Sequence, residues 1–385
     1  MKIRNIIHTS ILAFALIVCL TLSMSGIASA ADSVVIESAL DTAELFSDRD
    51  LNQTADLTDA VYYTVSDGED IHITSEGVYV LSGSASDVTV YVEAGDDDKV
   101  QLVLDGVRIE NTDFPCIYVK NADKVFVTTS ADSSLSVTGT FIADGDTHTD
   151  GVIFSRDDLT LNGTATLSIR SSENGVVCKD DLKITGGTYA VTAASKCFEA
   201  NDSIRVADGT FELTAGTDGL HAENDEDDTL GYIYIADGSF ILDAGDDGLH
   251  ATTVVQIDGG SFDISAAEGI EGTYIQINDG TIRIDSRDDG INGAAKSSAY
   301  WPTIEINGGD ITVVMASGDT DGIDCNGNLI INGGTIDVTG QSAFDYDGTG
   351  QYNGGTIIVN GQQVSTLPNQ MGMGGGRSGK GNRWG

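Results

Sequence analysis

The strongest constraint in this sequence is a short phrase that recurs at nearly regular spacing between residues 150 and 345. The phrase consists of an acidic or polar residue, a glycine, a bulky apolar residue and a second polar residue. Clear copies begin at Asp218, Asp247, Glu268, Asp289 and Asp321. Including two divergent copies with Cys197 and Ala343 at the glycine position, successive copies lie 24, 22, 22, 29, 21, 21, 32 and 21 residues apart. Such a period is typical of proteins built from stacked structural repeats.

A second phrase, Asn or Asp followed by Gly and then Thr or Ser, alternates with the first. Around it, as in residues 281–285 and 335–338, apolar and polar side chains alternate with a period of two, which predicts β-strands. Asn-Gly and Asp-Gly favour turns because these residues tolerate positive φ. Short strands that repeat in this way without a helical pattern predict a parallel β-helix, whose coils stack ~4.8 Å apart. A β-propeller blade would need about twice this period, and a leucine-rich repeat would need its Leu/Asn signature.

The chain divides into four expected segments. An apolar run after Lys2 and Arg4, followed by small residues up to Ala30, predicts a signal peptide cleaved after Ala30 and a secreted, extracellular protein. The expected segments are the signal peptide over 1–30, an N-terminal cap or leader over 31–69, a single all-β domain over 70–361 and a Gly-rich flexible tail over 362–385.

The charge of the chain restricts its partners. Among 385 residues, sixty acidic and nineteen basic side chains give a formal net charge of −41, which becomes −43 when Lys2 and Arg4 leave with the signal peptide. A surface this acidic repels phosphate groups and anionic lipid heads, so we expect no nucleic-acid partner. We also expect no membrane insertion, because no later apolar run is long enough to span a bilayer. The surface instead attracts cations.

Four cysteines remain after cleavage, namely Cys116, Cys178, Cys197 and Cys325. Each lies in an apolar strand pattern, and no pair has the CxxC spacing. A chain that can bury a core of this size does not depend on disulfides. We therefore expect four buried thiols and no disulfide framework.

Stacking aligns the first phrase into two polar columns, one immediately before the glycine and one two residues after it. Carboxylates held one strand spacing apart repel each other unless a cation neutralises them, and oxygen-rich sites suit Ca²⁺. We therefore predict calcium binding between coils and a fold that depends on it. The expected ligands are Asp218, Asp246, Asp247, Glu268, Glu271, Asp288, Asp289, Asn292, Asp321 and Asp324.

Two other interpretations of these columns stay open. In the first, the acids form a solvated face where Asp is chosen because it favours the turn. In the second, His221 and His250, which adjacent coils bring together, bind a transition metal. Surface histidines stacked by the repeat explain the same pattern without a metal.

Two coils are longer than the others, and their additional residues must loop out of the stack. The first insertion, residues 223–228, carries five acids but lacks the EF-hand spacing. The second contains Lys296, Tyr300 and Trp301. Because an exposed aromatic ring on a rigid scaffold can grip the apolar face of a sugar, we predict these three residues as a substrate-binding site. The alternative is that Trp301 packs back onto its coil.

Catalytic signals are sparse. The motifs GxSxG and HExxH and a phosphate-binding loop are absent, and acidic pairs are too abundant to indicate a glycosidase. Lys196 interrupts the acidic column and is the candidate base of a Ca²⁺-dependent lyase. An ion pair with a neighbouring acid is the simpler explanation of this lysine.

Several separate blocks, in order, resemble those of a known family. The blocks are 77–83 (GVYVLSG), 99–107 (KVQLVLDGV), 117–125 (IYVKNADKV) and 319–327 (DTDGIDCNG). Over about residues 70–361 the chain is similar to an exported carbohydrate-binding β-helix family. The resemblance implies a right-handed parallel β-helix related to the pectate-lyase superfamily, bound calcium, and binding of plant cell-wall polysaccharides such as cellulose and acidic pectic sugars. Cys325 departs from the usual Ser at a small-residue position.

Three functional hypotheses follow. The first is a secreted, calcium-stabilised, non-catalytic protein that binds plant cell-wall polysaccharides. The second is a Ca²⁺-dependent polysaccharide lyase of the pectate type. The third is a structural solenoid that serves adhesion at a surface. The expected partner is a polysaccharide, and an association with the cell surface stays open.

Overall fold

The computed structural model describes residues 38–318 and 320–369, which belong to one compact unit, Ile36–Gly385. The predicted signal peptide over 1–30 and residues 370–385 of the predicted tail lie outside the described residues. The described part of the chain contains strands and turns but no α-helix. Accordingly, nothing in these residues offers a helix long and apolar enough to cross a membrane.

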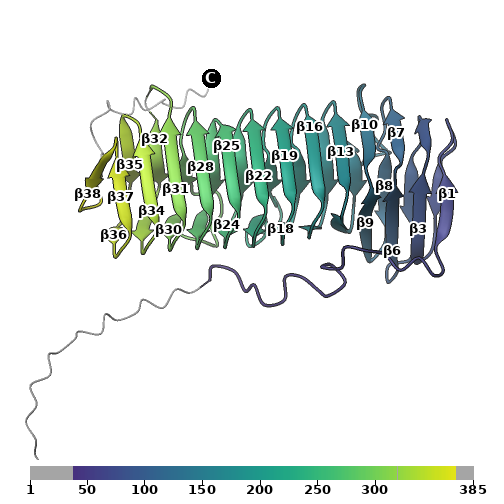
Figure 1. Cartoon of the computed structure of the whole chain (residues 1–385), viewed down its shortest axis with the longest axis horizontal. Helices are drawn as coiled ribbons and strands as arrows, with labels where there is room; N and C mark the ends of the chain where they lie inside the picture. The colour runs from purple at the N-terminus through teal and green to yellow at the C-terminus, as the bar shows by residue number, and fades with distance from the viewer. Residues whose placement is uncertain (1–37, 319, 370–385) are drawn as a thin grey trace, which may run out of the picture. The chain divides into compact units, whose positions relative to one another are not determined.

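Three sheets of parallel strands form the walls of a β-helix (Figure 1). From β1 to β37, successive strands along the chain belong to different sheets, and each pairs with the equivalent strand of the neighbouring coil. The predicted fold, an all-β right-handed parallel β-helix, is confirmed.

The three sheets contain thirteen, thirteen and twelve strands among the described residues. The first sheet comprises β1 (Val61–Thr64), β3 (Gly77–Ser82), β6 (Lys99–Asp105), β9 (Lys124–Ala131), β12 (Asp158–Gly163), β15 (Asp181–Ile184), β18 (Ser203–Val206), β21 (Tyr232–Ile235), β24 (Val254–Ile257), β27 (Tyr274–Ile277), β30 (Thr303–Ile306), β33 (Asn328–Ile331) and β36 (Gly350–Tyr352). The second comprises β4 (Ser84–Ser86), β7 (Arg108–Asn111), β10 (Ser133–Val137), β13 (Thr166–Ser171), β16 (Thr188–Ala193), β19 (Thr210–Ala215), β22 (Ser239–Ala244), β25 (Ser261–Ala266), β28 (Thr281–Ser286), β31 (Asp310–Met315), β34 (Thr335–Thr339), β37 (Thr356–Val359) and β38 (Gln362–Val364). The third comprises β2 (Ile71–Ile73), β5 (Val90–Glu93), β8 (Ile117–Asn121), β11 (Gly151–Ser155), β14 (Asn174–Cys178), β17 (Phe198–Ala200), β20 (Leu220–Ala222), β23 (Asp247–Ala251), β26 (Glu268–Gly272), β29 (Ile291–Gly293), β32 (Asp321–Cys325) and β35 (Ser342–Tyr346).

The register of the third sheet follows the repeated phrase. Leu220 pairs with Leu249, and Ile291 pairs with Ile323, so the apolar position of the phrase stacks from coil to coil. These side chains are fully buried, whereas the polar residue that follows each of them points outward from the strand. The repeat thus places one polar side chain per coil on the outer face of this sheet.

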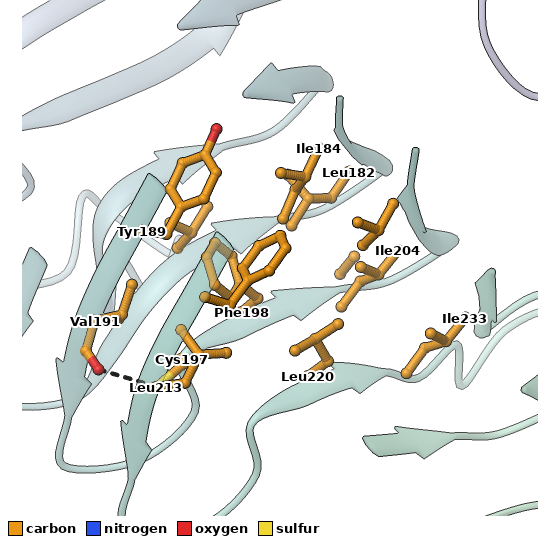
Figure 2. Packing of buried hydrophobic residues seen from close by; sticks show 14 of the residues in the cluster. Leu182, Ile184, Tyr189, Val191, Cys197, Phe198, Ile204, Leu213, Leu220 and Ile233 are labelled. Atoms are coloured by element: carbon orange, nitrogen blue, oxygen red, sulfur yellow. Dashed lines mark hydrogen bonds between the residues drawn. The ribbon is translucent and has the colours of Figure 1, made fainter. Parts of the chain in front are cut away.

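Apolar side chains from all three sheets fill the interior. Figure 2 shows Ile204 of the first sheet, Leu213 of the second and Phe198 of the third pointing into the same core. The ring of Phe240 stacks on its neighbour in the second sheet, Phe211, with centroids 4.4 Å apart and ring planes 2° from parallel. Such ladders form because one residue type recurs at the same position of successive coils.

The glycine of the repeated phrase allows the coils to approach closely. A Cβ atom at Gly290 would lie 2.4 Å from the carbonyl oxygen of Gly322 and 2.4 Å from Cγ1 of Val313. Any side chain there would push apart two coils and the neighbouring strand of the second sheet. Close packing therefore requires glycine at residue 290.

Residues 38–53, here called the N-terminal strap, run along the outside of the first sheet. The backbone N–H of Ala39 donates to Oε1 of Gln276 (2.9 Å), and that of Leu40 donates to Oε1 of Gln256 (2.9 Å). Further along the strap, Gln53 donates to the carbonyl oxygen of Thr185 (2.9 Å). This placement differs from the expected cap over the end of the solenoid, because these partners lie on strands well inside the sheet.

The strap is fastened by a buried carboxylate, Asp50, which is 1% exposed. Its oxygens lie 3.2 Å from Nζ of Lys124 and 3.6 Å from Nζ of Lys183, and they accept hydrogen bonds from Thr160 (3.1 Å) and Ser47 (2.8 Å). A buried charge persists only when it is paired and hydrogen-bonded in this way. Asp50 thereby links the strap to three neighbouring strands, β9, β12 and β15.

The sheets extend beyond the predicted limits of 70 and 361 at both ends. β1 begins at Val61 and pairs with β3, although its sequence lacks the repeated phrase. β38 lies in the predicted tail and pairs antiparallel with β37. The repeat period cannot reveal these strands, because each pairs with a single neighbour and follows no repeat.

The four predicted thiols are all free and buried. Burial raises the pKa of the Cys116 thiol to about 12, which keeps it protonated at neutral pH. The expectation of small buried side chains at these positions is confirmed.

Candidate functional site

The outer face of the third sheet carries the two predicted polar columns. In the first column Asp247 pairs with Glu268, and Asp321 pairs with Ser342. The second column contains Glu199, His221, His250, Glu271, Asn292, Asp324 and Asp345, each paired with the next. The stacking of these residues, which the repeat spacing predicted, is confirmed.

In the middle of this face every stacked carboxylate has a basic partner. The ion pairs are Lys179–Glu199 (3.3 Å), Lys196–Glu199 (3.3 Å), His221–Asp218 (2.8 Å), His250–Asp247 (2.6 Å), His250–Glu271 (3.0 Å) and Lys296–Glu271 (2.8 Å). We call these residues the paired section. Their own bases compensate the charge that the sequence pattern attributes to the acids.

Toward the C-terminal end of the same face lies a group of oxygen donors without such bases. This acidic row consists of Glu268, Asp289, Asn292, Asp321, Asp324 and Asp345. Within residues 38–318 and 320–369, no Lys, Arg or His side chain forms an ion pair with any acid of the row. The Nδ2 group of Asn292 donates to Glu268 (2.9 Å), and the backbone N–H of Asp321 donates to Asp289 (2.9 Å).

Three acids of the row, Glu268, Asp289 and Asp324, resist ionisation. Burial raises the pKa of Glu268 to about 8, and repulsion from Glu271 and Asp247 adds to the shift. Burial likewise raises the pKa of Asp324 to about 7, with repulsion from Asp289. Burial raises the pKa of Asp289 to about 6. Carboxyl groups whose charged forms are destabilised by burial and by each other bind protons or a cation.

Two oxygens of the row are buried and have no hydrogen-bond partner, namely Oδ1 of Asn292 and Oδ1 of Asp345. A buried polar atom without a partner is costly unless a ligand satisfies it. Carboxylate and amide oxygens are the donors that Ca²⁺ prefers, with six to eight ligands in tolerant geometry. The row therefore offers donors of the type that calcium takes, spread over successive coils. Among the described residues, no three acids of the row bring one oxygen each within 4.8 Å of one another.

The ten predicted calcium ligands are thus distributed over three environments. Asp218, Asp247 and Glu271 belong to the paired section, where His221, His250 and Lys296 lie beside them. Asp246 and Asp288 are exposed at the turns that precede the third sheet. The remaining five, Glu268, Asp289, Asn292, Asp321 and Asp324, lie in the acidic row.

The predicted substrate-binding residues do not converge. Lys296 turns toward the third sheet, where its Nζ contacts Glu271. The ring of Tyr300 lies 6.2 Å from the ring of Tyr274, on the first sheet. Trp301 is 67% exposed, so it does not pack back onto its coil. Of the three predicted residues, Trp301 is the one that presents an exposed aromatic ring.

Lys196, the candidate base, forms an ion pair with Glu199 three residues later. The same carboxylate also binds Lys179. This arrangement matches the ion-pair explanation of Lys196.

Sequence reasoning missed the partners of the two stacked histidines. The side chains of His221 and His250 are 8% and 12% exposed, whereas stacked surface histidines would be open to solvent. The available signal was the spacing in Asp-Gly-Leu-His, which places an acid three residues before each ring. Lys179 and Lys296 reach the face from turns and insertions, so no periodic pattern could place them.

A comparison of the sequence places the chain in a family. The sequence profile of a family described as "Carbohydrate-binding domain-containing protein" matches residues 67–319 and 267–366, which is most of the chain. The chain belongs to this family. A carbohydrate-binding domain-containing protein of Acetivibrio thermocellus is 33% identical over 188 residues, which cover 48% of this chain and 64% of that relative. The shared region therefore spans less than two thirds of the relative's length.

A solved structure is also similar to this carbohydrate-binding family member. It is the polysaccharide lyase-like protein from C. thermocellum, as a gadolinium derivative, with 25% sequence identity and a TM-score of 0.46. The alignment covers 76% of this chain and 99% of that chain.

Proposed function

We propose that the mature chain is an exported, non-catalytic protein that binds acidic plant cell-wall polysaccharides through calcium held by the acidic row. Family membership supports a carbohydrate partner. The single observation that carries the rest is the acidic row itself, a set of stacked oxygen donors without basic partners among the described residues.

Calcium would solve an electrostatic problem. A mature chain with a net charge of −43 repels a polyuronate, and the acids of the row repel one another. A Ca²⁺ ion bound by the row offsets part of this negative charge and leaves coordination positions for a sugar carboxylate. The bound cation then attracts the acidic sugar that the bare protein would repel.

Trp301 supplies the remaining feature of a sugar-binding surface. It lies in the insertion between β29 and β30. Along the chain, Trp301 follows Asn292 of the acidic row by fewer than ten residues. With 67% of its surface exposed, the indole offers a flat apolar face on which a sugar ring can stack. The aromatic ring would add affinity for the sugar ring itself, and the cation would select its carboxylate.

The proposal is tested by affinity electrophoresis of the mature chain in gels that contain polygalacturonate, with calcium or with EDTA. We expect retardation with calcium. With EDTA the affinity should fall by at least about tenfold, which corresponds to about 1.4 kcal/mol of binding free energy. The variant Asp289→Asn with Asp324→Asn should lose the calcium-dependent part. The matched control is Asp243→Asn with Asp263→Asn, which removes two exposed charges from the outer face of the second sheet.

Three results would contradict the proposal. Equal retardation with calcium and EDTA would show that the cation has no part in binding. No retardation by any polysaccharide would favour the structural solenoid. Release of unsaturated products, followed by their ultraviolet absorbance, would show a lyase instead of a binding protein.

A further inference from the structure

The phrase Asp-Gly-Leu-His occurs in two consecutive coils, over residues 218–221 and 247–250. The rings of His221 and His250 stack with centroids 4.5 Å apart and planes 21° from parallel. In each coil Nδ1 of the histidine approaches the aspartate three residues earlier, at 2.8 Å and 2.6 Å. Two adjacent coils therefore present the same imidazole and carboxylate unit on one face.

The second unit gathers a third ligand atom. Nδ1 of His250 lies 2.6 Å from Oδ2 of Asp247 and 3.0 Å from Oε2 of Glu271, which comes from the next coil. All three side chains are at least 88% buried. An imidazole nitrogen carries one hydrogen, so it cannot make a full hydrogen bond to both carboxylates. The two oxygens and the nitrogen converge on a single point.

The first unit adds an independent observation. His221 is 6% exposed, and its Nδ1 has no hydrogen-bond partner, because the contact to Asp218 lies outside hydrogen-bond geometry. Buried polar atoms of this kind are rare unless a ligand satisfies them. Nε2 of His221 does have a partner, Oε2 of Glu223 at 3.0 Å, so Nδ1 is the ring atom that remains available to a ligand.

We propose that Asp247, His250 and Glu271 form a site for a divalent transition metal of the Zn²⁺ type, separate from the calcium at the acidic row. Imidazole nitrogen and carboxylate oxygen are common ligands of such metals, whereas Ca²⁺ takes oxygen ligands. Ligand atoms around a tetrahedral zinc lie about 3.3 Å apart, so the two short contacts need to open by less than 1 Å.

Neighbouring groups suit such a site. Nζ of Lys296 lies 2.8 Å from Oε2 of Glu271. As an outer partner it can hold this carboxylate in place, while the other lone pair of Oε2 faces the metal. A hollow of about 390 Å³ beside Lys296 is lined by the acidic insertion over residues 223–228 and by Thr252. Its carboxylates attract cations toward the site. Three protein ligands leave a fourth position for water or a sugar oxygen.

The chain contains a matched comparison for this site. His148, Asp150 and Glu173 also place an imidazole and two carboxylates close together, but the side chain of His148 is 71% exposed. Exposed groups of this kind remain solvated and need no metal. Replacement of His148 therefore controls for the loss of any histidine beside acids.

The test is metal binding by the mature chain after removal of bound metals. Titration with Zn²⁺ is followed by calorimetry, and titration with Co²⁺ by its visible absorption, both with calcium saturating. We expect about one equivalent of Zn²⁺ and the intense visible bands of tetrahedral Co²⁺. His250→Gln and Glu271→Gln should each weaken binding by at least about 100-fold. His148→Gln should bind as the parent chain does.

The outcomes separate this site from the calcium proposal. Zinc binding that survives in Asp289→Asn with Asp324→Asn, and calcium binding that survives in His250→Gln, support two sites. Circular dichroism of each variant shows whether it is folded, and the cobalt spectrum of the parent chain tests the site without any variant. No tetrahedral cobalt bands, or zinc affinity unchanged in folded His250→Gln, would overturn the metal site and leave the calcium proposal standing.

Discussion

At the scale of single residues, Asp50 shows how a buried charge fastens a peripheral segment. Burial by itself would raise the pKa of Asp50, but hydrogen bonds from Ser47 and the attraction of Lys124 and Lys183 outweigh it and lower the pKa to about 2. The carboxylate therefore stays ionised under the strap. Because the folded pKa lies below the ordinary value of 3.8, ionised Asp50 stabilises the folded state at neutral pH.

We predict that Asp50→Asn lowers the free energy of unfolding by at least about 2 kcal/mol at pH 7, since each pKa unit is 1.36 kcal/mol. Ionised Asp50 contributes its full stabilisation at pH values above its pKa in the unfolded chain. This contribution is lost as the pH falls through its pKa in the folded state. The difference between parent and variant should thus be greatest above about pH 4 and shrink toward pH 2. Denaturant unfolding at several pH values measures it.

The control for this prediction is Asp48→Asn, which removes an exposed acid of the same strap. It should leave stability within about 0.5 kcal/mol of the parent chain at every pH. If Asp50→Asn and Asp48→Asn behave alike, the buried ion pair does not fasten the strap.

At the scale of elements, the turn into each third-sheet strand depends on close contact between coils. Gly290 sits where a Cβ atom would meet both the carbonyl oxygen of Gly322 and the side chain of Val313 at 2.4 Å. Neither neighbour can retreat without disturbing its own coil, because interiors are packed to high density. This coil therefore requires glycine at residue 290, although Cys197 and Ala343 occupy the same position of the phrase in two other coils.

We predict that Gly290→Ala destabilises the β-helix by about 1–3 kcal/mol, the usual range for overpacking. Gly318→Ala is the matched control, since a Cβ atom there meets a single side-chain atom of Thr320 at 3.5 Å. Thermal unfolding of the two variants should give a lower melting temperature for the first alone. Equal melting temperatures would mean that the coils separate more easily than their packing indicates.

The same scale shows what the sequence could predict. The coils and the two polar columns were predictable, because one phrase repeats and stacking puts equal positions together. The position of the strap was not predictable, because its hydrogen bonds join residues far apart in the chain. Asp50, for example, bonds to Thr160, which comes 110 residues later. The division of the outer face into a paired section and an acidic row was also hidden, since it depends on where Lys179 and Lys296 point.

At the scale of the whole molecule, charge couples the fold to its partners. A net charge of −41 makes the folded state repel itself, most strongly where the acids of the row are stacked. A cation that binds the folded state and not the unfolded chain stabilises it by mass action, by about 2.7 kcal/mol at a concentration 100 times its Kd. Stability and sugar binding should therefore respond to the same ion.

The most direct measurement of this coupling is the melting temperature of the mature chain with calcium and with a chelator. We expect the chelator to lower it, and we expect Asp289→Asn with Asp324→Asn to shrink that difference, while Asp243→Asn with Asp263→Asn leaves it unchanged. If the parent chain contains no calcium as purified and melts at the same temperature with and without chelator, the acidic row is a solvated face and does not bind calcium.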